Sequence, residues 1–219
     1  MVLNAIIRLI VSAAITAGLL FWPAGNVFWG RGWLFMLLFF IPMALIAIYL
    51  FRCDRELLKR RLQTKESKPK QGLIANLFYA SIGLTLVTAG LDNRYGWSSV
   101  PEPLVLISAI CFLVGYFFLF LVFKENRYLA HTVVTEEGQR VVTTGPYAVV
   151  RHPMYLSQLV MFIFAPMLLG SYVALISLPF FLVAFVSRII KEEEILLQEL
   201  PGYREYTKTT RYRLVPCLW

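Results

Sequence analysis

Long apolar segments alternate with short polar ones along most of this chain. Four long apolar runs come first, at residues 5–22, 33–51, 73–90 and 103–123. A helix of roughly 20 residues crosses about 30 Å of hydrocarbon, so each run predicts one membrane span. Two shorter runs follow a polar stretch, residues 154–169 and 171–187, with Gly170 between them. We interpret these two as a tight helical hairpin, which brings the prediction to about six spans.

Composition agrees with a membrane protein. Hydrophobic residues make up 58% of the 219 residues and charged residues only 16%, whereas soluble domains carry roughly a quarter charged residues. The formal net charge of +8 does not indicate nucleic-acid binding, because the basic residues lie in loops that flank the apolar runs, as membrane orientation requires. The predicted fold class is therefore an all-α integral membrane protein.

The distribution of Lys and Arg predicts the orientation of the chain. Residues 52–70 hold eight of the 21 Lys and Arg residues, residues 124–153 hold four, and the tail from Arg188 holds six. Only Arg31 and Arg94 lie in the loops on the opposite side. Because short loops rich in Lys and Arg stay in the cytoplasm, we expect both termini to face the cytoplasm. We expect the membrane to be an inner or plasma membrane.

The sequence predicts neither a disulfide framework nor a metal site. Its three cysteines, Cys53, Cys111 and Cys217, are widely spaced, and they form no Cys-x-x-Cys pair and no Cys/His cluster. The predicted spans contain almost no ionisable residues, which argues against an ion pathway or a proton relay.

Polar residues gather in two stretches that flank the predicted hairpin, so both should meet at one membrane face. The first stretch, residues 138–155, contains a Gly145-Pro146 turn that brings the backbone close to whatever it encloses. His152 and Tyr155 then begin a helix, with Pro153 in its first turn. The two side chains share one face of that helix, and its start offers free N–H groups to an anionic ligand. The alternative is that the basic residues here only anchor the helix at the lipid headgroups.

The second stretch, residues 188–206, leaves the hairpin. Arg188 and Glu192 are four residues apart, and we expect them to pair across one helical turn. Glu192 lies about where the last span leaves the membrane, and a carboxylate there can hold a cationic ligand group in a partly dry site. Three successive carboxylates cannot all point inward from a helix. We expect Glu192 and Glu193 to serve the site and Glu194 to face solvent.

Together the two stretches resemble the isoprenylcysteine carboxyl methyltransferase family and its phospholipid methyltransferase relatives. The family pattern is a Gly-Pro-Tyr turn, Arg-His-Pro-x-Tyr, a helical hairpin, Arg-x-x-x-Glu-Glu, and a Tyr-x-x-Tyr tail ending in Pro. The chain is similar to it at Gly145-Pro146-Tyr147, Arg151-His152-Pro153-Met154-Tyr155, Arg188 with Glu192-Glu193, Tyr203-Arg204-Glu205-Tyr206 and Pro216, with Asn126 preceding them. We therefore divide the chain into an N-terminal four-span membrane region, residues 1–123, and a C-terminal methyltransferase-like module, residues 124–219.

The resemblance implies an S-adenosylmethionine-dependent methyltransferase that binds its cofactor at the cytoplasmic end of the last helices. No Gly-x-Gly-x-x-Gly turn follows a strand, so the soluble dinucleotide fold is not indicated. The resemblance implies cofactor contacts from Gln139, Val141, Val142, Gly145, Pro146, Tyr147, His152, Tyr155 and Glu192. Within this set, Glu192 would bind the ammonium of the methionine part. It gives Arg188 and Glu193 the catalytic role of positioning the acceptor, and Arg188 suits a carboxylate.

The expected acceptor is a lipid-like molecule that enters from the bilayer, with the carboxylate of an isoprenylcysteine-type substrate favoured. Phospholipid, amine and thiol acceptors stay open, and an amine would require a base such as Glu193 or His152. Two other interpretations are an NADPH-dependent sterol-type reductase, whose motif has Asn where Met154 stands here, and a non-enzymatic membrane scaffold. Membrane lipids are the expected surroundings, and the sequence identifies no protein partner.

Overall fold

The regular structure is entirely helical in the residues that the computed structural model describes, which are 2–62, 69–129 and 139–219. The helices are α1 (Val2–Ala24), α2 (Gly30–Cys53), α3 (Arg55–Arg61), α4 (Pro69–Tyr95), α5 (Glu102–Glu125), α6 (Pro153–Leu168), α7 (Leu178–Glu199) and α8 (Tyr203–Thr209). Two 3₁₀ turns, η1 (Gly145–Ala148) and η2 (Val173–Ser177), interrupt the connections.

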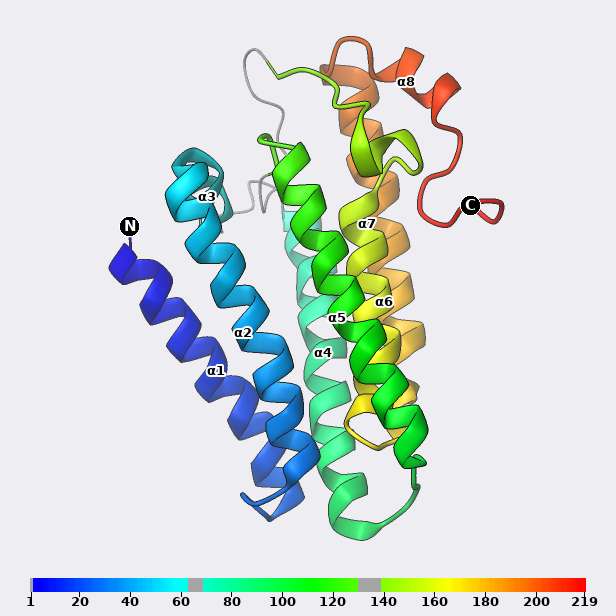
Figure 1. The fold of residues 1–219 in the computed structure, drawn as a ribbon. Coiled ribbons are helices and arrows are strands. Elements are labelled where there is room, and N and C mark those ends of the chain that lie inside the picture. Colours follow the sequence, from blue (N-terminus) through cyan, green and yellow to red (C-terminus); the bar gives the residue numbers. More distant parts are fainter. Residues whose placement is uncertain (1, 63–68, 130–138) are drawn as a thin grey trace.

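Six apolar helices run up and down in one bundle (Figure 1). By length and composition, α1, α2, α4, α5 and the η2–α7 segment could each cross a membrane. The first four correspond to the four predicted spans. Helix α6 has 16 residues and is therefore only about 24 Å long at 1.5 Å per residue. The described residues thus contain five candidate spans and one shorter apolar helix, where the sequence predicted about six spans.

The second arm of the hairpin lies further along the chain than its apolar run predicted. The run ended at Ser187, but α7 begins at Leu178 and continues to Glu199. The residues after Ser187 are Arg, Lys, Glu, Gln, Leu and Ile, and most of these types favour a helix, so α7 continues beyond the apolar segment. Helices α6 and α7 contact each other through aromatic rings, with the Phe162 and Phe181 centroids 3.6 Å apart.

A glycine brings α5 and α6 close together. A Cβ atom at Gly115 would lie 2.6 Å from Met161 Cγ and 3.1 Å from the Ser157 carbonyl oxygen. Small residues permit such close approach where lipid gives no hydrophobic drive for helices to associate. The contact places the end of α5 beside the start of α6.

The turns at the opposite end of the bundle are joined by a buried carboxylate. Asp92, near the end of α4, is 1% exposed. It accepts hydrogen bonds from the Ser98 backbone N–H at 2.7 Å, from the Ser98 hydroxyl and from the Ser171 hydroxyl at 2.5 Å. A buried carboxylate needs such donors. Asp92 therefore fixes α4 to the connection between α6 and η2.

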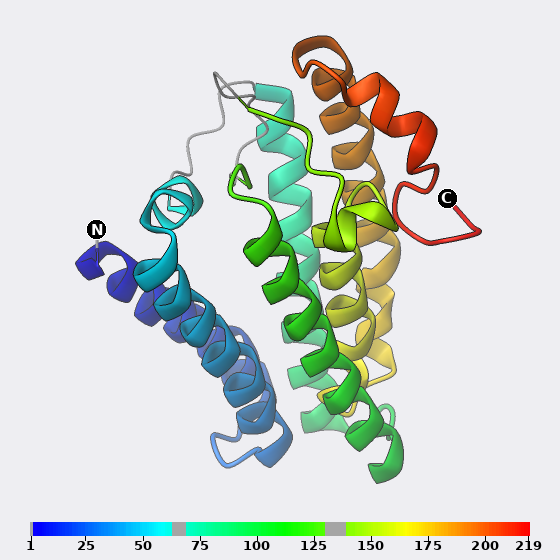
Figure 2. The ribbon, with the colours of Figure 1, turned by 45° about the horizontal axis from the view of Figure 1, so that its top comes forward.

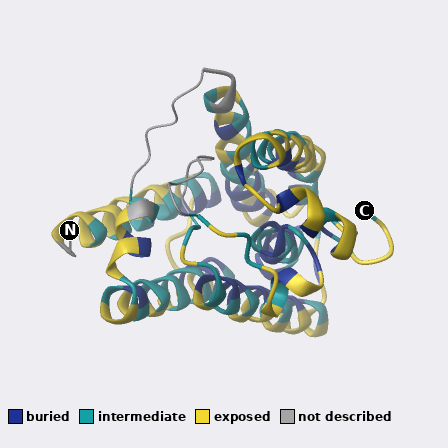
Figure 3. Cartoon of the chain, turned by 90° about the horizontal axis from the view of Figure 1, so that it is seen from above, coloured by how far each residue is buried: buried dark blue, intermediate teal, exposed yellow. Residues whose placement is uncertain are grey.

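The outward faces of the bundle are apolar. Seen from the end that carries α8, exposed residues cover the outer sides of α1 and α2 (Figure 3). Large apolar side chains on α1, α2 and α5 are exposed, including Ile10, Leu45, Ile110 and Phe117. Exposed apolar surface of this extent is normal only where lipid or another apolar partner covers it. The fold is that of an integral membrane protein.

The basic segment 52–70 contains a short helix, α3, that the apolar pattern did not indicate. Helix α3 lies at the end of the bundle that also carries η1 and α8 (Figure 2). Two parts of the polar segments lie outside the described residues. They are residues 63–68 of this basic segment and residues 130–138, which lead into the first polar stretch. The predicted cytoplasmic orientation of this end stays a prediction.

Candidate active site

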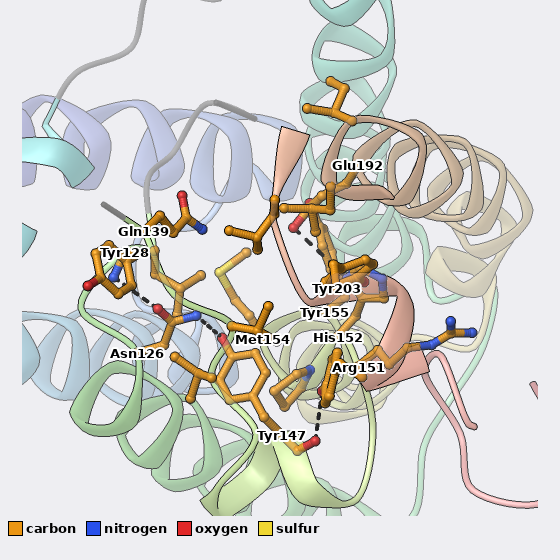
Figure 4. A pocket seen from close by; sticks show the side chains of 18 of the residues that line it. Asn126, Tyr128, Gln139, Tyr147, Arg151, His152, Met154, Tyr155, Glu192 and Tyr203 are labelled. Carbon is orange, nitrogen blue, oxygen red and sulfur yellow. Dashed lines mark hydrogen bonds and ion pairs between the residues drawn. The ribbon is translucent and has the colours of Figure 1, made fainter. Parts of the chain in front are cut away.

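A pocket opens at this end of the bundle, where the two polar stretches meet. Its walls come from the end of α5, the extended residues 139–142, η1, the start of α6, the end of α7 and α8 (Figure 4). Its empty volume is about 870 Å³, including the part open to solvent.

Most of the predicted cofactor residues line this pocket: Gln139, Val141, Val142, Tyr147, His152, Tyr155 and Glu192. Gly145 and Pro146 do not line it. They form η1, in which Gly145 has a φ of +57° and faces the Glu125 carboxylate so closely that a Cβ would lie 3.0 Å from it. The turn therefore acts through its shape, which presents Tyr147 to the pocket.

Tyr147 is held from both sides. Asn126, at the C-terminal cap of α5, donates a hydrogen bond to the Tyr147 hydroxyl at 2.8 Å. The Tyr206 hydroxyl donates to the Tyr147 carbonyl oxygen at 2.7 Å. Burial raises the pKa of Tyr147, although the Asn126 bond opposes the shift. Tyr147 is therefore a fixed, neutral aromatic wall.

The Arg151-His152 turn is fastened by the C-terminal tail. The backbone N–H groups of Arg151 and His152 donate to the carbonyl oxygens of Tyr212 and Arg213, each at 2.9 Å. His152 is the N-cap of α6 and Pro153 occupies its first turn, as the sequence predicted. The tail thus sets the position of the imidazole.

Tyr155 links Arg188 with Glu192. The Tyr155 hydroxyl donates to Glu192 Oε2 at 2.6 Å and accepts from Arg188 Nε at 3.0 Å. Arg188 and Glu192, which were expected to pair directly because of their four-residue spacing, are thus bridged by a hydroxyl from α6. His152 Nδ1 lies 4.0 Å from Glu192 Oε1. All four side chains line the pocket.

Glu193 points away from this group. It is 4% exposed and does not line the pocket. Its carboxylate accepts from Arg213 Nε at 2.6 Å and lies 3.2 Å from Arg151 Nε and 3.3 Å from His152 Nε2. Arg188 therefore reaches the pocket, whereas Glu193 contacts Arg151 and His152, which line the pocket, and Arg213, which does not. Glu194 is exposed, as predicted.

Several wall residues had no role in the sequence-based prediction: Tyr128, Leu129, Arg140, Met154, Ile195, Leu196, Leu200, Tyr203 and Tyr206. The two tail tyrosines belong to a motif that the sequence displayed. Gly202, with φ of +83°, turns the chain from α7 into α8, a conformation that costs glycine little. That turn folds the tail back over η1, which no local pattern indicates.

The side chains that line the pocket suit an organic ligand that carries both positive and negative charge. Glu192 has 23% of its side chain exposed and supplies a carboxylate for a cation. Tyr147 and Tyr155 supply aromatic faces. Within residues 2–62, 69–129 and 139–219, no group of three or more His, Cys, Asp or Glu is placed to hold a metal ion.

Comparison with known families agrees with this site. Residues 106–199 match the model of the isoprenylcysteine carboxyl methyltransferase (ICMT) family. The match begins in α5 and ends with α7, so it contains η1, the Arg151-His152 turn and the acidic part of α7. No curated protein matches the chain. The resemblance found in the motifs is confirmed by this match over residues 106–199, and a domain of this family indicates a membrane methyltransferase.

Proposed function

We propose that this protein transfers a methyl group from S-adenosylmethionine to the carboxylate of a lipid-like acceptor of the isoprenylcysteine type. The family domain supports the reaction class. The observation that carries the finer proposal is the Arg188–Tyr155–Glu192 arrangement in one pocket. It presents a carboxylate to one ligand and a guanidinium to another, a few ångströms apart.

The pocket residues fit the methyl donor. Glu192 would hold the α-ammonium, and His152 Nδ1 on its other side keeps the carboxylate from turning away. Tyr147 and the extended residues Val141 and Val142 would enclose the nucleoside. When bound, the sulfonium supplies a methyl carbon whose bond to sulfur breaks as its bond to the acceptor oxygen forms, so a neutral thioether leaves. The protein's part is to hold both partners in line and to exclude water.

The electrostatics around Arg188 favour an anionic acceptor. Arg61 of α3 approaches the same region, with Nη1 3.7 Å from the Met154 sulfur and its guanidinium 5.1 Å from the Phe123 ring centroid. Burial lowers the pKa of the Arg61 guanidinium, and the charge of Arg188 acts in the same direction. Two such cations stabilise a carboxylate between them, and a carboxylate nucleophile needs no general base.

An amine acceptor would need a base, and the geometry offers a poor one. Glu193 is occupied by Arg151, His152 and Arg213. His152 is engaged as well, with Nε2 3.3 Å from the Glu193 carboxylate and Nδ1 4.0 Å from that of Glu192. Carboxylate methylation therefore fits these residues better than amine methylation. The acceptor chain would lie in the bilayer, and the water-soluble donor would enter from the cytoplasmic end.

The proposal is tested first by ligand binding and methyl transfer. We expect S-adenosylhomocysteine to stabilise the detergent-solubilised protein, by about 2.7 kcal/mol at 100 times its dissociation constant, whereas NADPH gives no shift. Labelled methyl from S-adenosylmethionine should appear on N-acetyl-S-farnesylcysteine and not on its methyl ester. Stabilisation by NADPH alone would point to a reductase. Label on phosphatidylethanolamine alone would point to an amine acceptor.

Arg188→Met is expected to lower kcat/KM for N-acetyl-S-farnesylcysteine by about 10- to 100-fold, because it removes a charge-assisted contact with the acceptor. The affinity for S-adenosylhomocysteine should change no more than a few-fold, since Tyr155 keeps its bond to Glu192. Kinetics and isothermal titration on the same preparation separate the two quantities. Lys191→Met on the same helix is the matched control. Equal losses of donor affinity and of kcat/KM would assign Arg188 to the donor site instead.

A further inference from the structure

The hydroxyl of Tyr203 is buried without a partner. Tyr203 is 4% exposed and lines the pocket. Its oxygen has no hydrogen-bond partner among the described residues. Leaving a buried hydroxyl unpaired costs about 1–3 kcal/mol, and such a group in a native fold requires an explanation. A hydroxyl aimed at a pocket is explained when the ligand of that pocket supplies the partner.

Neighbouring contacts fix the ring, so its hydroxyl is not free to turn elsewhere. The turn at Gly202 begins α8, and the Tyr203 backbone N–H donates to the Leu200 carbonyl oxygen at 3.2 Å. The Tyr206 ring packs with its centroid 5.7 Å from that of Tyr203. The Tyr206 hydroxyl is paired with the Tyr147 carbonyl oxygen. The two tyrosines of this short helix therefore differ. The Tyr206 hydroxyl has a hydrogen-bond partner, and the Tyr203 hydroxyl has none among the described residues.

The surroundings keep Tyr203 a hydrogen-bond donor. Burial raises its pKa well above the ordinary value, and the charges of Glu193 and Glu192 act in the same direction. The opposing charge nearby is that of Arg151, whose Nε is also buried without a hydrogen bond in the described part of the chain, although it lies 3.2 Å from the Glu193 carboxylate. The Tyr203 hydroxyl thus keeps its proton in a pocket that is also lined by a carboxylate, Glu192, and a cation, Arg151. Tyr203, Tyr155 and His152 line the same pocket (Figure 4).

We propose that Tyr203 donates this hydrogen bond to the α-carboxylate of the amino-acid part of the methyl donor, next to Glu192 on its α-ammonium. The two groups of an amino acid sit on one carbon, so the donor for the carboxylate belongs beside the acceptor for the ammonium. Arg151, which also lines the pocket, contributes positive charge to it. This inference rests on the proposed function and extends it to a residue beyond the family match, which ends at residue 199.

Tyr203→Phe removes only the hydroxyl and tests the proposal by titration calorimetry on the full-length protein in detergent. We expect it to weaken S-adenosylhomocysteine binding by about 10-fold, the scale of one hydrogen bond to a charged group. Binding of S-adenosyl-3-thiopropylamine, which keeps the ammonium and lacks only the carboxylate, should be the same in both proteins. The ligand-free variant should melt no lower than the wild type, because the hydroxyl makes no bond that is lost.

The outcomes separate this inference from the proposed function. Tyr212→Phe, on an exposed ring outside the pocket, should change neither affinity. If wild-type protein binds neither ligand, the proposed function fails and this inference fails with it. If it binds both and Tyr203→Phe weakens them equally, the hydroxyl serves another part of the donor, such as a ribose oxygen. If ligand-free Tyr203→Phe melts several degrees lower, the hydroxyl has a structural role. Either of the last two results overturns the assignment and leaves the proposed function standing.

Discussion

Replacing Glu192 by Gln is expected to weaken S-adenosylhomocysteine binding by about 100-fold, while the ligand-free protein folds as before. Losing one partner of a desolvated, hydrogen-bonded charge pair costs about 2–5 kcal/mol. The amide oxygen of Gln can still accept the Tyr155 hydroxyl that Glu192 accepts at 2.6 Å. The side chain is 23% exposed, so removing its charge leaves no strongly buried group unpaired.

Titration calorimetry and thermal melting check the two halves of this prediction together. Glu194→Gln is the control, because Glu194 is the exposed acidic neighbour on the same helix. An analogue of S-adenosylhomocysteine without its amino group should bind the wild type and Glu192→Gln equally well. Undiminished affinity of Glu192→Gln for the complete ligand would exclude Glu192 as the ammonium site.

Replacing Glu193 by Gln should act on folding instead. We expect it to destabilise the protein by about 3–5 kcal/mol, because it removes a buried anion that two arginines share. Arg151, His152 and Arg213 all approach this carboxylate within 3.3 Å, and the neutral amide would leave the charges of Arg151 and Arg213 uncompensated. The Arg151-His152 turn and the tail are joined through the same carboxylate, so both should loosen.

Chemical unfolding of Glu193→Gln in detergent measures this loss, with Glu194→Gln again as the matched control. Partial recovery in Glu193→Gln combined with Arg213→Met is expected, since one uncompensated charge is then gone. The competing hypothesis, in which Glu193 positions the acceptor, predicts full stability with reduced turnover. That result would falsify the structural role assigned here.

The order of elements could be predicted from the sequence because the signal is local. The free energy of transferring an apolar run into hydrocarbon depends on the residues of that run alone. The four long runs therefore matched α1, α2, α4 and α5. The helix start at Pro153 was also predictable, because its fixed φ suits the first turn. Helix α3 and the last turn of α7, up to Glu199, were missed, since a polar helix carries no apolar signal.

The motifs identified the family and most of the pocket, because each motif places its residues on one turn or one helix face. They did not decide which side chains meet. Glu192 and Glu193 are adjacent, yet on a helix they point about 100° apart, and only the packing of α7 against α6 selects the one that enters the pocket. The same packing inserts Tyr155 between Arg188 and Glu192.

The sequence by itself therefore determined the reaction class and the apolar helices, both of which depend on short-range pattern. The tertiary structure alone decided the rotation of α7, the burial of Glu193 and the return of α8 over η1. These depend on contacts between residues far apart in the chain, such as Tyr206 with Tyr147 and Arg213 with Glu193. No local propensity encodes them, because their free energy exists only once the helices have packed.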